Sequence, residues 1–231
     1  MSEPLPVHGF VLAGGKSTRM GVDKALLRFC GRAMIEIAVE TLRGFCAEVG
    51  IAGNRDDLAG FAPVVHEKRM DAGPGAGIEA GLMAASQPWV MFLPVDVPLV
   101  PMELLRNWAE AVIGADDGEG PVGSYLLVGG KPQPAFCLLR KECLGAWSGS
   151  LNNGERRLVW LLSEARVPGR SAVRPVEAEG FAATAEPTSV EMDFWFSNVN
   201  TPQEMMEAEA WAGDRQEKLH PVVHHRKNNN E

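Results

Sequence analysis

Three cationic side chains follow a short apolar run near the start of the chain. Residues 10–12 are Phe, Val and Leu, a run typical of a buried strand. The residues directly after it have small side chains or none, which lets backbone N–H groups approach a ligand closely; they are Ala13, Gly14 and Gly15. The cations come next, and they are Lys16, Arg19 and Lys24. A strand, a small-residue turn and a cationic loop together predict a site for a nucleoside triphosphate, whose phosphates the cations neutralise.

Two common phosphate-binding loops do not fit this stretch. The dinucleotide fingerprint requires G-x-G-x-x-G, but the first two glycines of this loop are adjacent. The Walker loop requires G-x-x-x-x-G-K-[ST], and its first glycine would fall at Phe10, inside the strand. A plain turn with scattered surface charge remains as the alternative, and the unbroken pattern over residues 12–24 argues against it.

Other polar residues fall at the ends of predicted strands. Apolar runs predict strands over residues 48–52, 64–65 and 89–93, and the residues between them predict helices over 31–45, 78–85 and 101–113. This alternation predicts an α/β fold: a Rossmann-like three-layer αβα sandwich with a mostly parallel, doubly wound sheet. Ligands of such sheets bind beyond the carboxyl ends of the strands, where the sequence places Leu12, Asn54, Glu67 and Asp96.

The signals are weaker beyond residue 113. They predict, in order, a loop, a strand, a helix, an irregular stretch and a last strand over residues 114–120, 134–139, 156–165, 181–189 and 192–199. Thr201 and Glu204 form a capping box that starts a final helix. We expect one domain over residues 1–212, made of halves of about 7–113 and 114–212, with a polar, disordered tail over 213–231.

Composition and charge exclude several classes of protein. A net charge of −8 and a pI near 5.2 leave no basic face for nucleic acid. No apolar run reaches the length of a membrane span, and residues 1–8 carry no leader signal. The four cysteines form no C-x-x-C pair, which argues against a structural zinc site. We expect a cytoplasmic protein with reduced thiols, without nucleic-acid or membrane partners.

The loop of residues 12–24, L-A-G-G-x-S-x-R-M-G-x-D-K, resembles the signature loop of the MobA-like nucleotidyltransferases. Within that family it is most similar to the molybdenum cofactor guanylyltransferase branch, whose members join GMP from GTP to the phosphate of molybdopterin and release pyrophosphate. The resemblance is clear over residues 7–113 and again over 196–209. It implies GTP and molybdopterin as substrates, Mg²⁺ as cofactor, and transient contact with molybdoenzymes or other proteins of cofactor biosynthesis.

The resemblance also implies roles for individual residues. Lys24 is the main phosphate contact, Arg19 neutralises the leaving pyrophosphate, and Lys16 is a weaker candidate. Asp96 lies in L-P-V-D-V-P, which is similar to the metal motif of the family, and completes a catalytic set with Arg19 and Lys24. Asn200, in N-V-N-T-P, is the second metal ligand that the resemblance implies.

The GTP-contacting set implied by the resemblance follows the strand ends. It comprises Leu12, Ala13, Gly14, Gly15, Lys24, Asn54, Glu67, Gly75 and Asp96. Gly75 belongs to G-P-G-A-G over residues 73–77, which is similar to the G-P-L-A-G segment of the family. Residues 131–134 and 154–157 resemble weaker segments on the molybdopterin side, where Arg156 or Arg157 is a candidate contact for the molybdopterin phosphate.

Two departures from the family pattern bear on the choice of base. Ala52 replaces the first Asn of the N-x-N-R loop, and Glu67 stands where Asp usually contacts guanine. Glu67 still accepts hydrogen bonds from the N1–H and N2–H₂ groups of guanine, with a longer reach. The turn at residues 13–15 matches the guanylyl branch, whereas cytidylyl relatives usually carry Ala-Ala-Gly. The alternatives are a molybdopterin cytidylyltransferase or another sugar-nucleotidyltransferase-like enzyme, and a nucleotide-binding module without turnover.

Overall fold

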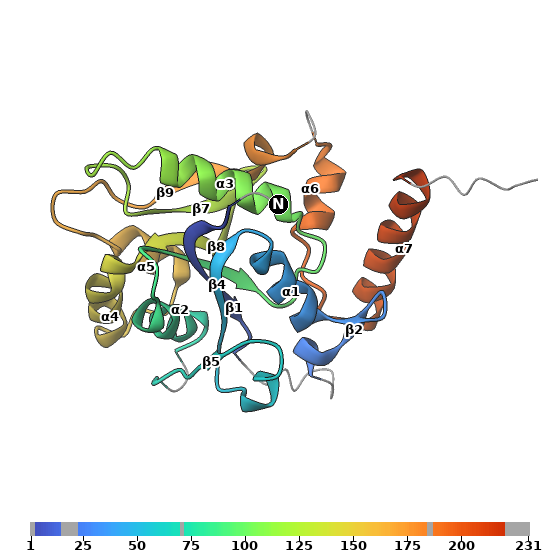
Figure 1. Cartoon of the computed structure of the whole chain (residues 1–231), viewed down its shortest axis with the longest axis horizontal. Coiled ribbons are helices and arrows are strands. Elements are labelled where there is room, and N and C mark those ends of the chain that lie inside the picture. The colour runs from blue at the N-terminus through green and yellow to red at the C-terminus, as the bar shows by residue number, and fades with distance from the viewer. Residues whose placement is uncertain (1–2, 15–22, 70–71, 184–186, 220–231) are drawn as a thin grey trace, which may run out of the picture.

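The computed structural model describes residues 3–14, 23–69, 72–183 and 187–219 of the 231-residue chain. A seven-stranded sheet forms its centre, in the order β5-β4-β1-β6-β8-β7-β9 (Figure 1). In chain order these strands are β1 (Leu5–Leu12), β4 (Cys46–Ala52), β5 (Val64–Val65), β6 (Trp89–Pro94), β7 (Gly123–Val128), β8 (Lys131–Arg140) and β9 (Arg174–Glu177). Within the described residues, this confirms the prediction of a mostly parallel α/β sheet.

Helices cover both faces of the sheet. One face packs against α1 (Met34–Arg43), α3 (Met102–Gly114) and α6 (Ser189–Trp195). The other packs against α2 (Pro74–Ala84), α4 (Leu144–Asn152) and α5 (Leu158–Glu164), which group together in Figure 1. The short 3₁₀ turns are η2 (Lys24–Leu26), η3 (Asp56–Leu58), η4 (Lys141–Cys143) and η5 (Ala178–Phe181). The three layers are those predicted from the sequence.

Strand alternation builds the two cores. Val11 and Met91 face the α1–α3 side, whereas Phe10 and Phe92 face the α2 side, and all four are buried. The rings of Phe10 and Phe92 stack with centroids 6.0 Å apart. Because residues 10–11 of β1 and residues 89–93 of β6 are buried, these stretches are apolar, which is why the two strands were predictable.

The sheet changes its direction of winding between β1 and β6. Strands β5, β4, β1 and β6 are parallel, with β4 and β5 on one side of β1 and β6 on the other. Strand β8 then pairs antiparallel with both β6 and β7, and β9 is parallel to β7. Ligands of doubly wound sheets bind at such a switch point, beyond the carboxyl ends of the strands.

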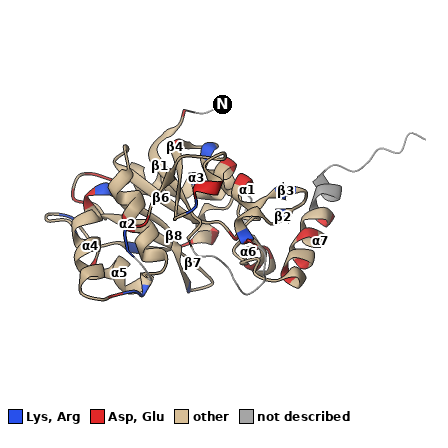
Figure 2. Ribbon diagram, turned by 90° about the horizontal axis from the view of Figure 1, so that it is seen from below, with Lys and Arg blue, Asp and Glu red and all other residues tan. Residues whose placement is uncertain are grey.

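A third, small core joins two segments that are far apart in the sequence. The β2–β3 hairpin (Arg28–Phe29 and Arg32–Ala33) lies beside α7 (Pro202–Leu219) at one end of the molecule in both views (Figures 1 and 2). The buried members of this core are Phe29, Met34, Val199 and Ala208. The Cys30 N–H also donates to Glu209 Oε1 over 2.7 Å. The chain just after Lys24 is thereby fixed against the chain just after Asn200.

The predicted last strand over residues 192–199 is wrong, because α6 occupies residues 189–195. Thr188 caps this helix in a full capping box: its hydroxyl accepts from the Glu191 N–H, and its own N–H donates to Glu191 Oε2. Met192, Trp195 and Phe196 follow helical spacing and are buried in the α1–α3 core. The aromatic run looks like a strand only when the capping box before it is ignored.

Other predicted boundaries shift, and some elements were not predicted. Helix α1 begins at Met34 rather than residue 31, and α2 begins at Pro74 rather than residue 78. Strands β7 and β9 and helix α4 were missed, although Gly129 and Gly130 both have positive φ and form a hairpin turn typical of such a pair. Helix α7 starts at Pro202 as predicted and continues to Leu219, so the first part of the predicted tail is helical.

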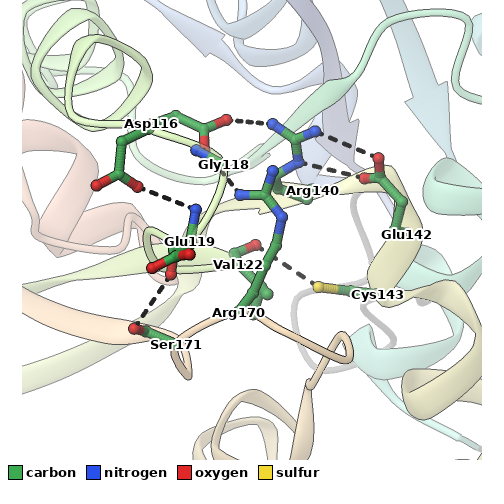
Figure 3. Close-up of polar contacts among 10 residues, drawn as sticks. Asp116, Gly118, Glu119, Val122, Arg140, Glu142, Cys143, Arg170 and Ser171 are labelled. Atoms are coloured by element: carbon green, nitrogen blue, oxygen red, sulfur yellow. Dashed lines mark hydrogen bonds and ion pairs between the residues drawn. The ribbon is translucent and has the colours of Figure 1, made fainter.

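Ion pairs fix the loop between α3 and β7. Asp116 accepts from Arg170 Nη1 over 2.7 Å and pairs with Arg140, which also pairs with Glu142 (Figure 3). Arg140 ends β8 and lies over the Trp89 ring, 5.1 Å from its centroid. In the part of the chain that is described, no helix is long and apolar enough to span a bilayer.

Candidate active site

The carboxyl ends of β1 and β6 meet at the switch point of the sheet. Leu12 and Pro94 are register partners at the two strand ends. The Ala13 N–H donates to the Ala52 carbonyl over 3.1 Å, which holds the small-residue turn against the end of β4. Backbone groups of the turn therefore lie at the edge where the sequence predicted a nucleotide.

Three of the predicted phosphate and metal residues lie together at this edge. The Val199 N–H donates to the Asp96 carbonyl over 2.8 Å, which places the segment before α7 across the end of β6. Lys24 Nζ lies 3.6 Å from Asp96 Oδ2 and donates a hydrogen bond to Asn200 Oδ1. The fold thus joins Lys24 and Asn200 across 176 positions of sequence.

The Asp96 carboxylate is under-neutralised where it lies. Its side chain is 21% exposed, and burial raises its pKa above the usual aspartate range, while Lys24 opposes that rise. Glu204 adds a repulsive charge and accepts from the Asn200 N–H over 2.6 Å. A partly buried carboxylate with one ammonium partner and one acidic neighbour favours a further cation.

The oxygen atoms at this point fit a hard divalent cation. In the structure the Lys24 ammonium lies between Asp96 and Asn200, so a positive charge already stands where their oxygens converge. Among the described residues no cluster of three or more His, Cys, Asp or Glu side chains could hold a metal alone. Two protein oxygens suit Mg²⁺, which keeps several waters and takes further ligands from substrate phosphates.

Arg55, which was predicted only as part of a polar loop, positions the turn that carries Lys24. Its guanidinium pairs with Asp57, at 2.9 and 2.7 Å, and with Asp23, whose Oδ1 lies 3.0 Å from Nη1. Asp23 in turn accepts from the Ala25 N–H over 3.0 Å and so caps η2. The hydrogen bonds from Asp57 and Asp23 raise the pKa of Arg55, which is only 6% exposed. The sequence signal that could have indicated this role is the Asn54-Arg55 pair, which matches the end of the N-x-N-R loop of the family.

Glu67 lies against the small residues of the predicted base site. A Cβ atom on Gly14 would lie 2.5 Å from Glu67 Oε1, and one on Gly77 would lie 3.3 Å from the same atom. Burial raises the pKa of Glu67, which is half-buried. No described residue donates a hydrogen bond to its carboxylate. The carboxylate therefore has free lone pairs beside Gly14 of the turn and Gly77 of α2, which have no side chains to cover it.

Other predicted site residues are placed differently or fall outside the described chain. Gly15, Lys16 and Arg19 lie outside the described residues. Asn54 follows β4 and is exposed. The predictions for these four residues remain predictions.

Gly75 is packed against the helices of the second half. A Cβ there would lie 2.9 Å from Leu161 Cδ1, and the Gly75 carbonyl accepts from Trp147 Nε1 over 2.9 Å. Its missing side chain makes room for α5, whereas the missing side chain of Gly77 makes room for Glu67. The predicted contact of Gly75 with GTP stays a prediction.

Comparison with known proteins identifies the family. The sequence pattern of the MobA-like NTP transferase domain matches residues 9–177. The chain belongs to this family. A molybdenum cofactor guanylyltransferase of Polynucleobacter asymbioticus is 32% identical over 220 residues, which cover 91% of this chain and 99% of the relative. A second, from Vibrio cholerae, is 30% identical over 213 residues, covering 88% and 91%.

A solved structure shows the same fold. The molybdopterin-guanine dinucleotide biosynthesis protein A of Archaeoglobus fulgidus superposes with a TM-score of 0.68 at 20% identity, covering 90% of this chain and 99% of the other. The chain is a nucleotidyltransferase of the MobA-like family, and enzymes of this family generally need a divalent metal ion.

Proposed function

We propose that this MobA-like enzyme transfers GMP from GTP to the phosphate of molybdopterin, releasing pyrophosphate and forming molybdopterin guanine dinucleotide. One observation carries the proposal: Lys24, Asp96 and Asn200 converge at the switch point, beside the turn that ends at Gly14. The names of its relatives, both molybdenum cofactor guanylyltransferases, support this choice of substrates.

The residues at the strand ends divide the work between base and phosphates. The backbone of Ala13 and Gly14 and the carboxylate of Glu67 bind guanine, with Glu67 accepting from its N1–H and N2–H₂ groups. Lys24 neutralises the triphosphate. Arg19, outside the described residues, keeps its predicted role at the leaving pyrophosphate.

Charge neutralisation and positioning account for the chemistry. A phosphate oxygen of molybdopterin forms a bond to the α-phosphorus of GTP, and the bond from that phosphorus to the β-phosphate bridge breaks, with its electron pair leaving on pyrophosphate. The attacking phosphate is already an anion near pH 7, so the step needs no strong general base. Asp96 and Asn200 would hold Mg²⁺, which would supply charge neutralisation between the triphosphate and the attacking oxygen. The protein supplies orientation and fixed charges.

The proposal includes a cellular setting. All four cysteines are unpaired, which fits a reducing cytoplasm. The product is a cofactor for other enzymes, so transient contact with molybdoenzymes or with other cofactor-biosynthesis proteins belongs to the same proposal. Contacts of the second half with molybdopterin, including those of Arg156 or Arg157, stay predictions.

A reconstituted assay tests the proposal. The protein is incubated with molybdopterin, Mg²⁺ and one of GTP, CTP or UTP, and both pyrophosphate and the dinucleotide product are measured. Of the three nucleotides, we expect only GTP to give a dinucleotide product. We expect no product when a chelator removes the metal. Cytosine dinucleotide with CTP would favour the cytidylyl alternative. Nucleotide binding without pyrophosphate release would favour a module that does not turn over.

A further inference from the structure

An ion pair outside the proposed catalytic set fixes the loop that carries Glu67. Arg69 Nε lies 2.6 Å from Glu79 Oε2, and Arg69 Nη2 lies 2.8 Å from Glu79 Oε1, so the guanidinium binds the carboxylate at two points. Arg69 Nη2 also donates to the Ser148 carbonyl of α4 over 3.4 Å. Glu79, on α2, is only 6% exposed, and the Arg69 pairing lowers its pKa. This is a charged, directional contact inside the base side of the molecule.

The loop after β5 approaches α2 at two points. Glu67 meets α2 at Gly77, and Arg69 meets it two residues later on both segments, at Glu79. Residues two apart on a helix do not face each other, so the two contacts reach α2 on different sides. The Arg69–Glu79 contact fixes the loop to α2 only two residues from Glu67, and this limits where the Glu67 carboxylate lies.

We infer that the Arg69–Glu79 ion pair is a positioning pair that holds Glu67 at the base site and thereby sets the preference for guanine, an inference that rests on the proposed function. An apolar pair would join the loop to α2 at a lower cost in desolvation. A two-point guanidinium–carboxylate contact adds a defined geometry that an apolar contact lacks. Reading the edge of a base requires that geometry, because a hydrogen-bonding site discriminates only when its acceptor is held in place.

The test replaces the guanidinium of Arg69 and keeps its positive charge. Arg69→Lys retains a cation for the buried Glu79 but loses the two-point contact. We expect the ratio of kcat/KM for GTP to that for CTP to fall about tenfold, the scale of a weakened hydrogen bond to a charged group. The loss should appear in KM and in the GTP dissociation constant measured by calorimetry, with kcat for GTP within about twofold of wild type.

A double-mutant cycle separates positioning from general structural support. In the Glu67→Gln background, Arg69→Lys should cause no further loss of selectivity, because the pair acts through Glu67. Arg106→Lys is the matched control, since Arg106 Nε pairs with Glu110 at 2.7 Å on α3. We expect no change of selectivity for that variant. Glu79→Gln serves as a second probe of the pair, with thermal unfolding of every variant checked first.

Each outcome decides one of two questions. Wild-type protein that shows no preference for GTP would overturn the proposed function. Wild-type protein that prefers GTP, with the same preference in folded Arg69→Lys and Glu79→Gln, would overturn the positioning role and leave the proposed function standing. Additive losses in the Glu67→Gln background would also overturn it, because the pair would then act by another route.

Discussion

Two clusters, each made of an aspartate and its cationic partners, lie at opposite edges of the same sheet and differ in how well the aspartate charge is compensated. Asp96 lies just beyond the carboxyl end of β6, with Lys24 and Asn200. Asp116 lies at the other edge with Arg140, which is the register partner of Trp89 at the start of β6. Burial raises the pKa of Asp96, whereas the hydrogen bond from Arg170 lowers the pKa of Asp116. The same side chain therefore behaves in opposite ways within one molecule.

The difference follows from the number of partners. Asp116 has two guanidinium partners and also accepts from the Gly118 N–H over 3.2 Å, so its negative charge is well compensated (Figure 3). Asp96 has one ammonium at 3.6 Å and is repelled by Glu204. A compensated cluster stabilises the fold, while an under-compensated one leaves room for a ligand that brings positive charge. On this contrast we interpret the Asp116 cluster as structural, and it supports the proposed functional role of Asp96.

Removing the under-compensated charge should break the contrast most strongly. Asp96→Ala is expected to lower metal-dependent turnover by about 10²- to 10³-fold, the cost of losing a central electrostatic group. The variant should unfold at the wild-type temperature or above it, because a poorly compensated, partly buried charge has been removed. Pyrophosphate release and thermal unfolding are measured on the same preparation. Near-normal turnover would contradict the assignment of Asp96.

Lys24 should have the next largest effect. Lys24→Ala removes a charge-assisted contact to the triphosphate, so we expect GTP binding and transfer to weaken about 10- to 100-fold. Lys16→Ala, in the same predicted loop, is the matched control and should do much less. Calorimetric titration of GTP and single-turnover transfer rates check both variants. Equal damage from the two substitutions would show that the ranking of the loop cations is wrong.

The first half of the fold was predictable because its strands are buried on both faces. Continuous apolar runs such as residues 89–93 mark central parallel strands, and polar residues at their ends mark the ligand edge. The second half of the fold was harder to predict because strand β9 is mostly exposed and its sequence has no apolar pattern. Helix α6 was missed because a cluster of aromatic residues outweighed the Thr188 capping box.

The site was predictable where residue type decides its role and not where packing decides it. Asp96, Lys24 and Asn200 were predicted from strand ends and motifs, and the structure places them together. The ion pairs of Arg55 and Arg69 were missed, since a loop arginine looks the same in sequence whether it is solvated or paired with carboxylates. Only tertiary contacts reveal those partners.

Glu67 offers a smaller and more selective effect. Glu67→Gln keeps the shape but replaces one acceptor with a donor, so guanine N1–H and N2–H₂ lose part of their partner. We expect the preference for GTP over other triphosphates to erode by about tenfold, more than turnover with the best substrate declines. Competition between nucleotides in wild type and variant measures it. An unchanged preference would return the reading of the base to the backbone at Gly14.

Asp116 should show the smallest effect, and it should concern stability alone. Asp116→Asn is expected to lower the melting temperature by a few degrees with unchanged transfer kinetics, because its partners lie at the edge opposite the site. The lowered pKa of Asp116 means that its stabilisation is present above the unfolded-state pKa of about 3.9 and is lost as pH falls through the folded-state value. The melting-temperature gap between wild type and Asp116→Asn should therefore be constant near neutral pH and close below about pH 4. Asp117→Asn, at the exposed neighbouring residue, is the control and should show a smaller gap. A gap that stays the same down to pH 2 would mean that the contribution of Asp116 does not come from its charge, and the contrast with Asp96 would then need another cause.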